Sequence, residues 1–266
     1  MTAAASRSGS AGLWGPRWGS RAEDWASSED MQVPTYAEAI RCVGIEPGQN
    51  VLDIGCGSGV FLRLAADRGA RVSGLDASEE LVELARKRVP EADVRVGEME
   101  ALPYDDESFD LVTGFNSFFF AADLAKALRE AGRVARPGAP VVIQVWGSPE
   151  RCDLEAMKVV ARRYFPAPPP DAPPPPRLWQ RGVLEGVASD AGLTPETSFD
   201  LSYAFEYPDA ETLGRLMLAP AGIGAAAGPE HEHELRAEIV EALAPYGTSG
   251  GGYHLHNEYR YLVARA

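Results

Sequence analysis

Short apolar runs alternate with segments of helical spacing through the first 150 residues. Apolar runs at 51–54, 71–76, 93–96, 109–114 and 141–146 have the length of buried strands, and helical spacing follows at 60–67, 79–88 and 124–134. Strands that alternate with helices are typical of a parallel sheet covered on both faces. The pattern therefore predicts an α/β fold with a doubly wound sheet.

The pattern changes after residue 146. Apolar residues alternate singly over 196–206, which predicts a strand, and 257–264 predicts the last strand. Helices are expected at 36–43, 153–164, 185–191 and 230–244. Residues 166–176 are mostly proline and predict an extended connection. Residues 1–12 are rich in Ala, Ser and Gly and are expected to be mobile, as is the turn over 247–252.

Three alternate glycines follow the first predicted strand. Gly55, Gly57 and Gly59 allow a tight turn and close approach of a ligand to the backbone, which indicates a nucleotide-type site. A dinucleotide fingerprint would need Gly or Ala where Val60 stands, and the Gly-Lys-Ser/Thr of a phosphate loop is absent. Asp76, at the end of the second strand, can accept hydrogen bonds from ribose hydroxyls, but an NAD enzyme would also have an acid there.

Composition narrows the class of partner. The 266 residues carry a net charge of −14, with 45% hydrophobic and 24% charged residues, and no dense Lys/Arg run that would bind a nucleic acid appears. No apolar run of about 18 residues predicts a membrane span, and no signal-peptide core is present. Cys42, Cys56 and Cys152 lack metal-ligand spacing, so a reduced, cytoplasmic protein without a metal is expected.

Four motifs give the chain a resemblance to a known family. They are VLDIGCGSG (51–59), GLDAS (74–78), GEMEALPYDDESFDLV (97–112) and REAGRVARPGAPVVI (129–143). In this order and separation they resemble the class I S-adenosylmethionine-dependent methyltransferases, in the small-molecule branch that includes the ubiquinone and menaquinone (type 11) enzymes. The resemblance implies a seven-stranded, mostly parallel sheet with an antiparallel last strand and helical lid insertions.

The resemblance also implies a set of cofactor-binding residues. Asp53 would hold the glycine loop and favour the ammonium group, and Asp76 would bind the ribose. Glu98 would accept from the adenine amino group, although most relatives have Asp there, and the Met99 N–H would reach a ring nitrogen. The full set is Asp53, Gly55, Cys56, Gly57, Gly59, Asp76, Ala77, Glu98, Met99 and Phe115.

Aromatic residues suggest where an acceptor molecule would bind. Trp14, Trp18, Trp25 and Tyr36 either pack an N-terminal helix onto the domain or, as the resemblance implies, belong to a lid that excludes water. Asn116 and Phe119 follow the fourth strand, where ligands bind in open α/β sheets. Asn116 is not followed by Pro-Pro-Tyr/Phe, the pattern of enzymes that methylate DNA bases or glutamine side chains.

Histidine residues give weaker signals. His231 and His233 lie two apart and do not share a helix face, so no metal site is predicted. His254 is a candidate general base, although a solvated histidine is more common.

The sequence therefore predicts methyl transfer from S-adenosylmethionine to a small apolar or aromatic molecule, by a monomer or homodimer. Residues 1–35 are expected to be a flexible N-terminus and lid, and 36–266 the catalytic domain, with insertions at 147–180 and 207–250 that shape the pocket. Two alternatives stay open: a binding or cyclising protein of the same fold, and an NAD-dependent dehydrogenase.

Overall fold

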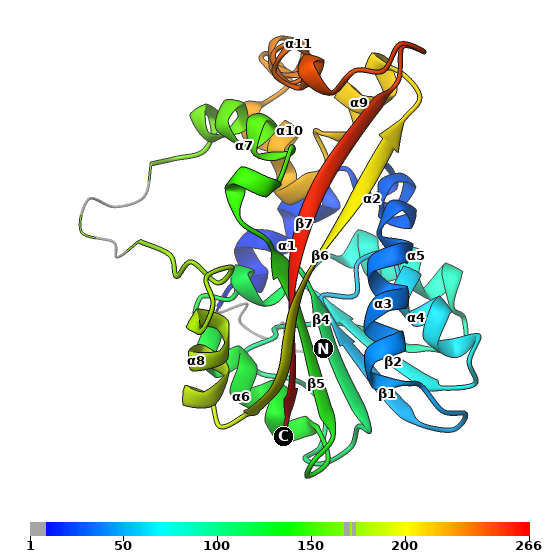
Figure 1. Cartoon of the computed structure of the whole chain (residues 1–266). Helices are drawn as coiled ribbons and strands as arrows, with labels where there is room; N and C mark the ends of the chain where they lie inside the picture. Colours follow the sequence, from blue (N-terminus) through cyan, green and yellow to red (C-terminus); the bar gives the residue numbers. More distant parts are fainter. Residues whose placement is uncertain (1–8, 168–170, 172–173) are drawn as a thin grey trace.

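The computed structural model describes residues 9–167, 171 and 174–266, and its centre is a seven-stranded sheet (Figure 1). The strand order is β3-β2-β1-β4-β5-β7-β6. The strands are β1 (Asn50–Ile54), β2 (Arg71–Asp76), β3 (Asp93–Val96), β4 (Leu111–Phe115), β5 (Pro140–Trp146), β6 (Thr194–Tyr207) and β7 (Tyr253–Arg265). The first five pair in parallel, and β7 pairs antiparallel with both β5 and β6. The predicted doubly wound fold with an antiparallel last strand is confirmed.

Two helical layers cover the sheet. Helices α3 (Val33–Val43), α4 (Val60–Ala66) and α5 (Glu79–Arg88) lie on one face, and α6 (Leu124–Val134) and α8 (Val183–Asp190) on the other (Figure 1). Residues of β1 alternate between the two cores, because Val51 packs with the α3 and α4 side chains and Leu52 with those of α6 and α8. Ser78 caps α5 by accepting from the Leu81 N–H at 3.2 Å.

A third group of helices lies beyond the carboxyl ends of the strands. From the N-terminal segment come α1 (Ala11–Gly19), α2 (Ala22–Glu29) and η1 (Asp30–Gln32). From residues 147–180 come η3 (Pro149–Arg151), α7 (Glu155–Ala161) and η4 (Arg162–Tyr164). The segment between β6 and β7 supplies α9 (Ala210–Leu216), η5 (Pro220–Gly222), α10 (Ile223–Ala227), α11 (Glu232–Leu243) and η6 (Ala244–Tyr246). One short helix, η2 (Phe118–Phe120), follows β4.

Several sequence-based boundaries need correction. The segment expected to be flexible holds helices over 11–19 and 22–32, with a turn at 20–21 between them, whereas residues 1–8 lie outside the described residues. The segment between β6 and β7 holds α9 and α10 as well as the one acidic helix expected there. β7 begins at Tyr253, four residues earlier than expected, because it stays paired with β6 as far as Tyr207. The predicted polyproline connection lies partly outside the described residues.

None of the helices in the described parts of the chain has the length and apolar character that a bilayer span requires.

Candidate functional site

A cavity of about 440 Å³ opens where the parallel strands end. Its wall is formed by residues that follow β1, β2, β4 and β5 and by the helices beyond them. The parallel order reverses between β1 and β4, so the cavity lies at the topological switch point where open α/β sheets bind ligands. The volume is in the range of small-molecule sites.

One part of the cavity wall, the glycine-loop wall, comes from the first half of the sheet. It consists of Gly55, Gly57, Asp76, Ala77, Leu81 and Met99. Gly55 and Gly57 have φ angles of +76° and +54°, which L side chains rarely adopt. A Cβ on Gly55 would lie 2.4 Å from the Ser117 Cβ, so the turn also requires the absence of a side chain. The loop therefore presents bare backbone to the cavity.

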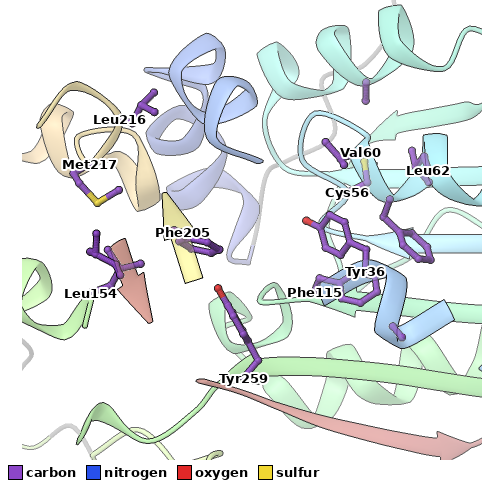
Figure 2. Packing of buried hydrophobic residues seen from close by; sticks show 14 of the residues in the cluster. Tyr36, Cys56, Val60, Leu62, Phe115, Leu154, Phe205, Leu216, Met217 and Tyr259 are labelled. Atoms are coloured by element: carbon purple, nitrogen blue, oxygen red, sulfur yellow. The ribbon is translucent and has the colours of Figure 1, made fainter. Parts of the chain in front are cut away.

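The opposing part, the aromatic wall, is assembled from distant segments. Its aromatic members are Trp14, Trp18, Trp25, Tyr36, Phe115, Phe119, Phe120, Trp146, Phe165, Phe205 and Tyr207. Trp14 and Trp18 meet the Phe120 ring edge-on, at centroid distances of 4.7 and 5.6 Å. Figure 2 shows the inner part of this arrangement, with Phe205 on β6 across from Tyr36 and Phe115. Both segments expected to shape the pocket contribute, with Met157 from one and Met217 from the other.

Three buried carboxylates lie around the glycine loop. Asp53 accepts from the Thr113 hydroxyl at 2.7 Å, and Asp76 accepts from the backbone N–H groups of Gly57 and Ser78 at 3.0 and 2.9 Å. Glu29, from α2, accepts from both the N–H and the hydroxyl of Ser58, at 2.8 and 2.6 Å. The N-terminal helices and the glycine loop are therefore joined directly by a carboxylate.

Burial disfavours the charged form of these acids. It raises the pKa of Glu29 to about 7, against the hydrogen bonds from Ser58 that favour the carboxylate. Burial, with the negative charges of Glu29 and Asp76 adding to it, raises the pKa of Asp53 to about 8, and burial also raises the pKa of Asp76. A cationic ligand would relieve this accumulation of like charge.

The predicted cofactor residues divide into two groups. Gly55, Gly57, Asp76, Ala77, Met99 and Phe115 line the cavity. Asp53, Cys56, Gly59 and Glu98 do not. Asp53 and Cys56 are buried, and Gly59 precedes α4, where a Cβ would lie 3.0 Å from the Ala85 Cβ.

Glu98 occupies a different position from the one the resemblance implies. It accepts from the Ser10 hydroxyl at 2.9 Å and from the Ala11 N–H at 2.8 Å. The longer side chain thus holds the start of α1 and is not a cavity-lining residue.

The residues predicted to bind the methyl acceptor all lie on the cavity wall, unlike the candidate general base. Trp14, Trp18, Trp25, Tyr36, Asn116 and Phe119 all line the cavity. Asn116 has φ of +51°, an uncommon conformation for a residue other than glycine. His254 lies on the exposed side of β7 with its ring stacked on His256 at 4.7 Å, and it is not a cavity-lining residue, so its position gives no support to the general-base role.

Sequence reasoning missed Glu29, Gln32 and Gln144. Gln144 carried a signal, since it is a polar residue inside the predicted buried strand 141–146. Glu29 and Gln32 carried none, because their burial depends on how the N-terminal helices fold back. Over the described residues, no cluster of three or more His, Cys, Asp or Glu side chains could hold a metal ion.

Comparisons with known proteins agree with this geometry. A methyltransferase-domain family model matches residues 52–143. An uncharacterized protein of Mycobacterium tuberculosis (strain H37Rv) is 30% identical over 238 residues, 84% of each chain. The 27-O-demethylrifamycin SV methyltransferase of Amycolatopsis mediterranei (strain S699) is 31% identical over 196 residues, 66% of each chain.

A solved structure shows the same fold. The [4+2]-cyclase SpnF superposes with a TM-score of 0.58 at 21% identity, over 87% of this chain and 80% of that one. At this identity the likeness concerns the fold alone. Together, the motifs, the matched domain and the relatives place the chain in the class I S-adenosylmethionine-dependent methyltransferase family, with S-adenosylmethionine as its cofactor.

Proposed function

We propose that the enzyme transfers the methyl group of S-adenosylmethionine to a small apolar or aromatic molecule bound against the aromatic wall. One observation carries the proposal: a single cavity joins the bare glycine loop and Asp76 to a wall built largely of aromatic rings. The net charge of −14 further favours a small molecule over a nucleic acid.

The residues of the glycine-loop wall fit the cofactor. Each Asp76 oxygen accepts one backbone hydrogen bond, and a carboxylate can accept about four, so acceptor positions remain for two ribose hydroxyls. Gly55 and Gly57 leave room for the methionine part beside the backbone. The buried acids Glu29, Asp53 and Asp76 suit a ligand that carries positive charge.

The bound cofactor supplies an activated methyl group, so the chain's own contribution is to orient the acceptor and exclude water. We propose that residues 1–35 form the lid over the domain at 36–266. Two contacts support this role. The rings of Trp14 and Trp18 close on Phe120, and Glu29 binds Ser58 of the glycine loop.

Replacement of Asp76 by alanine tests the cofactor site. Loss of two hydrogen bonds to a carboxylate, at about 1.5–3 kcal/mol each, predicts an affinity for S-adenosylhomocysteine at least about a hundredfold lower by calorimetry. Asp190→Ala, an exposed acid on α8, is the matched control and should bind as the wild type does. An unchanged affinity in the Asp76 variant would remove the basis of the proposal.

Two further measurements address the alternatives. Titration with NAD(H) should give no binding comparable with that of the cofactor, and tight binding would favour the dehydrogenase. Incubation with methyl-labelled S-adenosylmethionine and a panel of aromatic hydroxyl and amine compounds should label at least one of them. Measurable cofactor binding without any labelled product would favour a binding or cyclising protein.

A further inference from the structure

Gln144 is a polar side chain in the most apolar part of the sheet. It lies on β5 between Ile143 and Val145, is 1% exposed, and lines the cavity. A buried amide costs free energy unless its donors and acceptors are paired. The pairing of Gln144 therefore bears on what the cavity binds.

A short chain of hydrogen bonds fixes the orientation of the Gln144 amide. Gln144 Nε2 donates to the Tyr261 hydroxyl at 2.7 Å, and that hydroxyl donates to the Thr35 carbonyl oxygen at 2.9 Å. A phenol has one hydrogen, and a carbonyl oxygen can only accept, so the Tyr261 oxygen must receive a hydrogen from Gln144. The amide is thereby prevented from turning over, and the ambiguity that usually attends glutamine side chains is removed.

The other atom of the amide is left without a partner. Gln144 Oε1 is buried and accepts no hydrogen bond from any described residue. Another buried amide oxygen on the cavity wall, Asn116 Oδ1, also lacks a hydrogen-bond partner among the described residues. Gln144 and Asn116 are also adjacent in the sheet, because the Asn116 N–H donates to the Gln144 carbonyl at 2.9 Å. A largely apolar cavity thus presents buried amide oxygens that have no hydrogen-bond donor.

We propose that Gln144 Oε1 accepts a hydrogen bond from the methyl acceptor, and that this molecule carries a hydroxyl or N–H group on an apolar body. The inference rests on the proposed function and narrows its class of substrate. Gln144 would act by binding and orienting the acceptor. A molecule without a donor would leave the oxygen buried and unpaired, so the site should discriminate against it by about tenfold or more.

Isosteric pairs of probes test the proposal on the full chain. Indole and 2-naphthol carry a donor, whereas benzofuran and 2-fluoronaphthalene match their shapes without one. Dissociation constants would be measured by ligand-observed NMR, with and without S-adenosylhomocysteine. We expect each donor-bearing probe to bind about tenfold more tightly than its partner.

Two variants separate recognition from packing. Gln144→Met keeps the length of the side chain but removes the acceptor, so the affinity ratio within each pair should fall to about one while benzofuran binds as before. Tyr261→Phe keeps Gln144 but frees its amide to turn, so the ratio should fall to an intermediate value. A purely structural role would instead weaken both members of a pair equally, and melting temperatures would identify any variant that fails to fold.

The outcomes are distinct from those for the proposed function. Equal affinities within the wild-type pairs, no binding of either donor-bearing probe, or an unchanged ratio in Gln144→Met would overturn the inference. Failure of the wild type to bind S-adenosylhomocysteine would overturn the proposed function. The affinity ratio within each probe pair, measured without S-adenosylhomocysteine, would still test the role of Gln144.

Discussion

The glycine-loop wall and the aromatic wall enclose the same cavity but are built in different ways. In the first, every residue lies at the carboxyl end of a strand or within five residues after it, as Gly55 follows β1 and Ala77 follows β2. In the second, contacts join segments far apart in the chain, as where the Trp14 ring of α1 meets the Phe120 ring of η2 at a centroid distance of 4.7 Å. The first is local geometry of the backbone, whereas the second depends on the completed fold.

This difference suggests how the two walls respond to change. The glycine positions of the first wall tolerate few substitutions, because Gly55 and Gly57 have positive φ angles and no room for a side chain. The second wall, made of side chains from the N-terminal helices and the insertions, can change its lining while the sheet is kept. We expect substitutions in the first to affect cofactor binding, and those in the second to affect acceptor binding.

The largest effect is expected for Gly55→Ala. A positive φ angle costs an alanine about 1–2 kcal/mol, and contact with the Ser117 Cβ at 2.4 Å adds about 1–3 kcal/mol of overpacking. Ser117 cannot move away easily, because its hydroxyl donates to the Ile54 carbonyl at 2.6 Å. Urea unfolding should show a loss of roughly 2–5 kcal/mol, and calorimetry should show no binding of S-adenosylhomocysteine.

Gly48→Ala provides the matched control for backbone strain. Gly48 has a similar φ angle of +85°, but a Cβ there meets nothing within 4 Å. It should lose only about 1–2 kcal/mol of stability and retain cofactor affinity. Equal losses in the two variants would show that the close approach at Ser117 contributes nothing.

A smaller effect is expected from the pH dependence of the buried acids. The folded-state pKa values of about 7 for Glu29 and 8 for Asp53 lie above the ordinary values of 4.5 and 3.8. Both groups hold a proton in the folded chain at pH values where the unfolded chain has lost it. Their contribution to stability is therefore complete below about pH 4 and is lost as the pH rises through 7 to 8.

The free energy of unfolding of the ligand-free protein should thus decrease from pH 5 to pH 8, by at most about 1.4 kcal/mol per pH unit for each group. Glu29→Gln should reduce that slope, as measured by urea unfolding at intervals of half a pH unit. Glu46→Gln, which alters an exposed carboxylate, should keep the wild-type slope. A Glu29 variant with the wild-type slope would contradict the expected titration.

The contrast between the two walls also explains which parts of the fold and of the site could be predicted from the sequence. The sheet, the glycine loop and Asp76 could be predicted because strand and loop signals are adjacent in the chain. The positions of Trp14 and Trp18 on the cavity wall were predicted only through the family resemblance. Glu29 could not be found, since nothing in its neighbours reveals that α2 folds back onto Ser58.

Glu98 and His254 show the limit of motif and residue type, because their tertiary contacts do not support the roles that those signals suggested. Glu98 accepts a hydrogen bond at the start of α1, and no local sequence pattern predicts this contact. His254 was expected next to a flexible turn, but the β6 and β7 pairing extends past it and leaves its ring exposed. Long-range contacts thus limit prediction in the part of the molecule that would choose the acceptor.

The smallest effects are expected for the ion pairs that join the N-terminal helices to the elements around each wall. Asp24 on α2 pairs with Arg215 of α9, within the insertion at 207–250, whereas Asp30 of η1 pairs with Arg88 of α5 at 2.9 Å. Because exposed ion pairs contribute about 0–1 kcal/mol, Asp24→Asn should weaken binding of 2-naphthol by no more than about fivefold and leave the affinity for S-adenosylhomocysteine unchanged. Asp30→Asn should leave 2-naphthol binding unchanged.

Since salt screens such pairs, the effect of Asp24→Asn should largely vanish at about 0.5 M NaCl. If each variant weakened the binding of 2-naphthol and of S-adenosylhomocysteine equally, the N-terminal helices would couple the two walls. The two walls would then not be independent parts of the site.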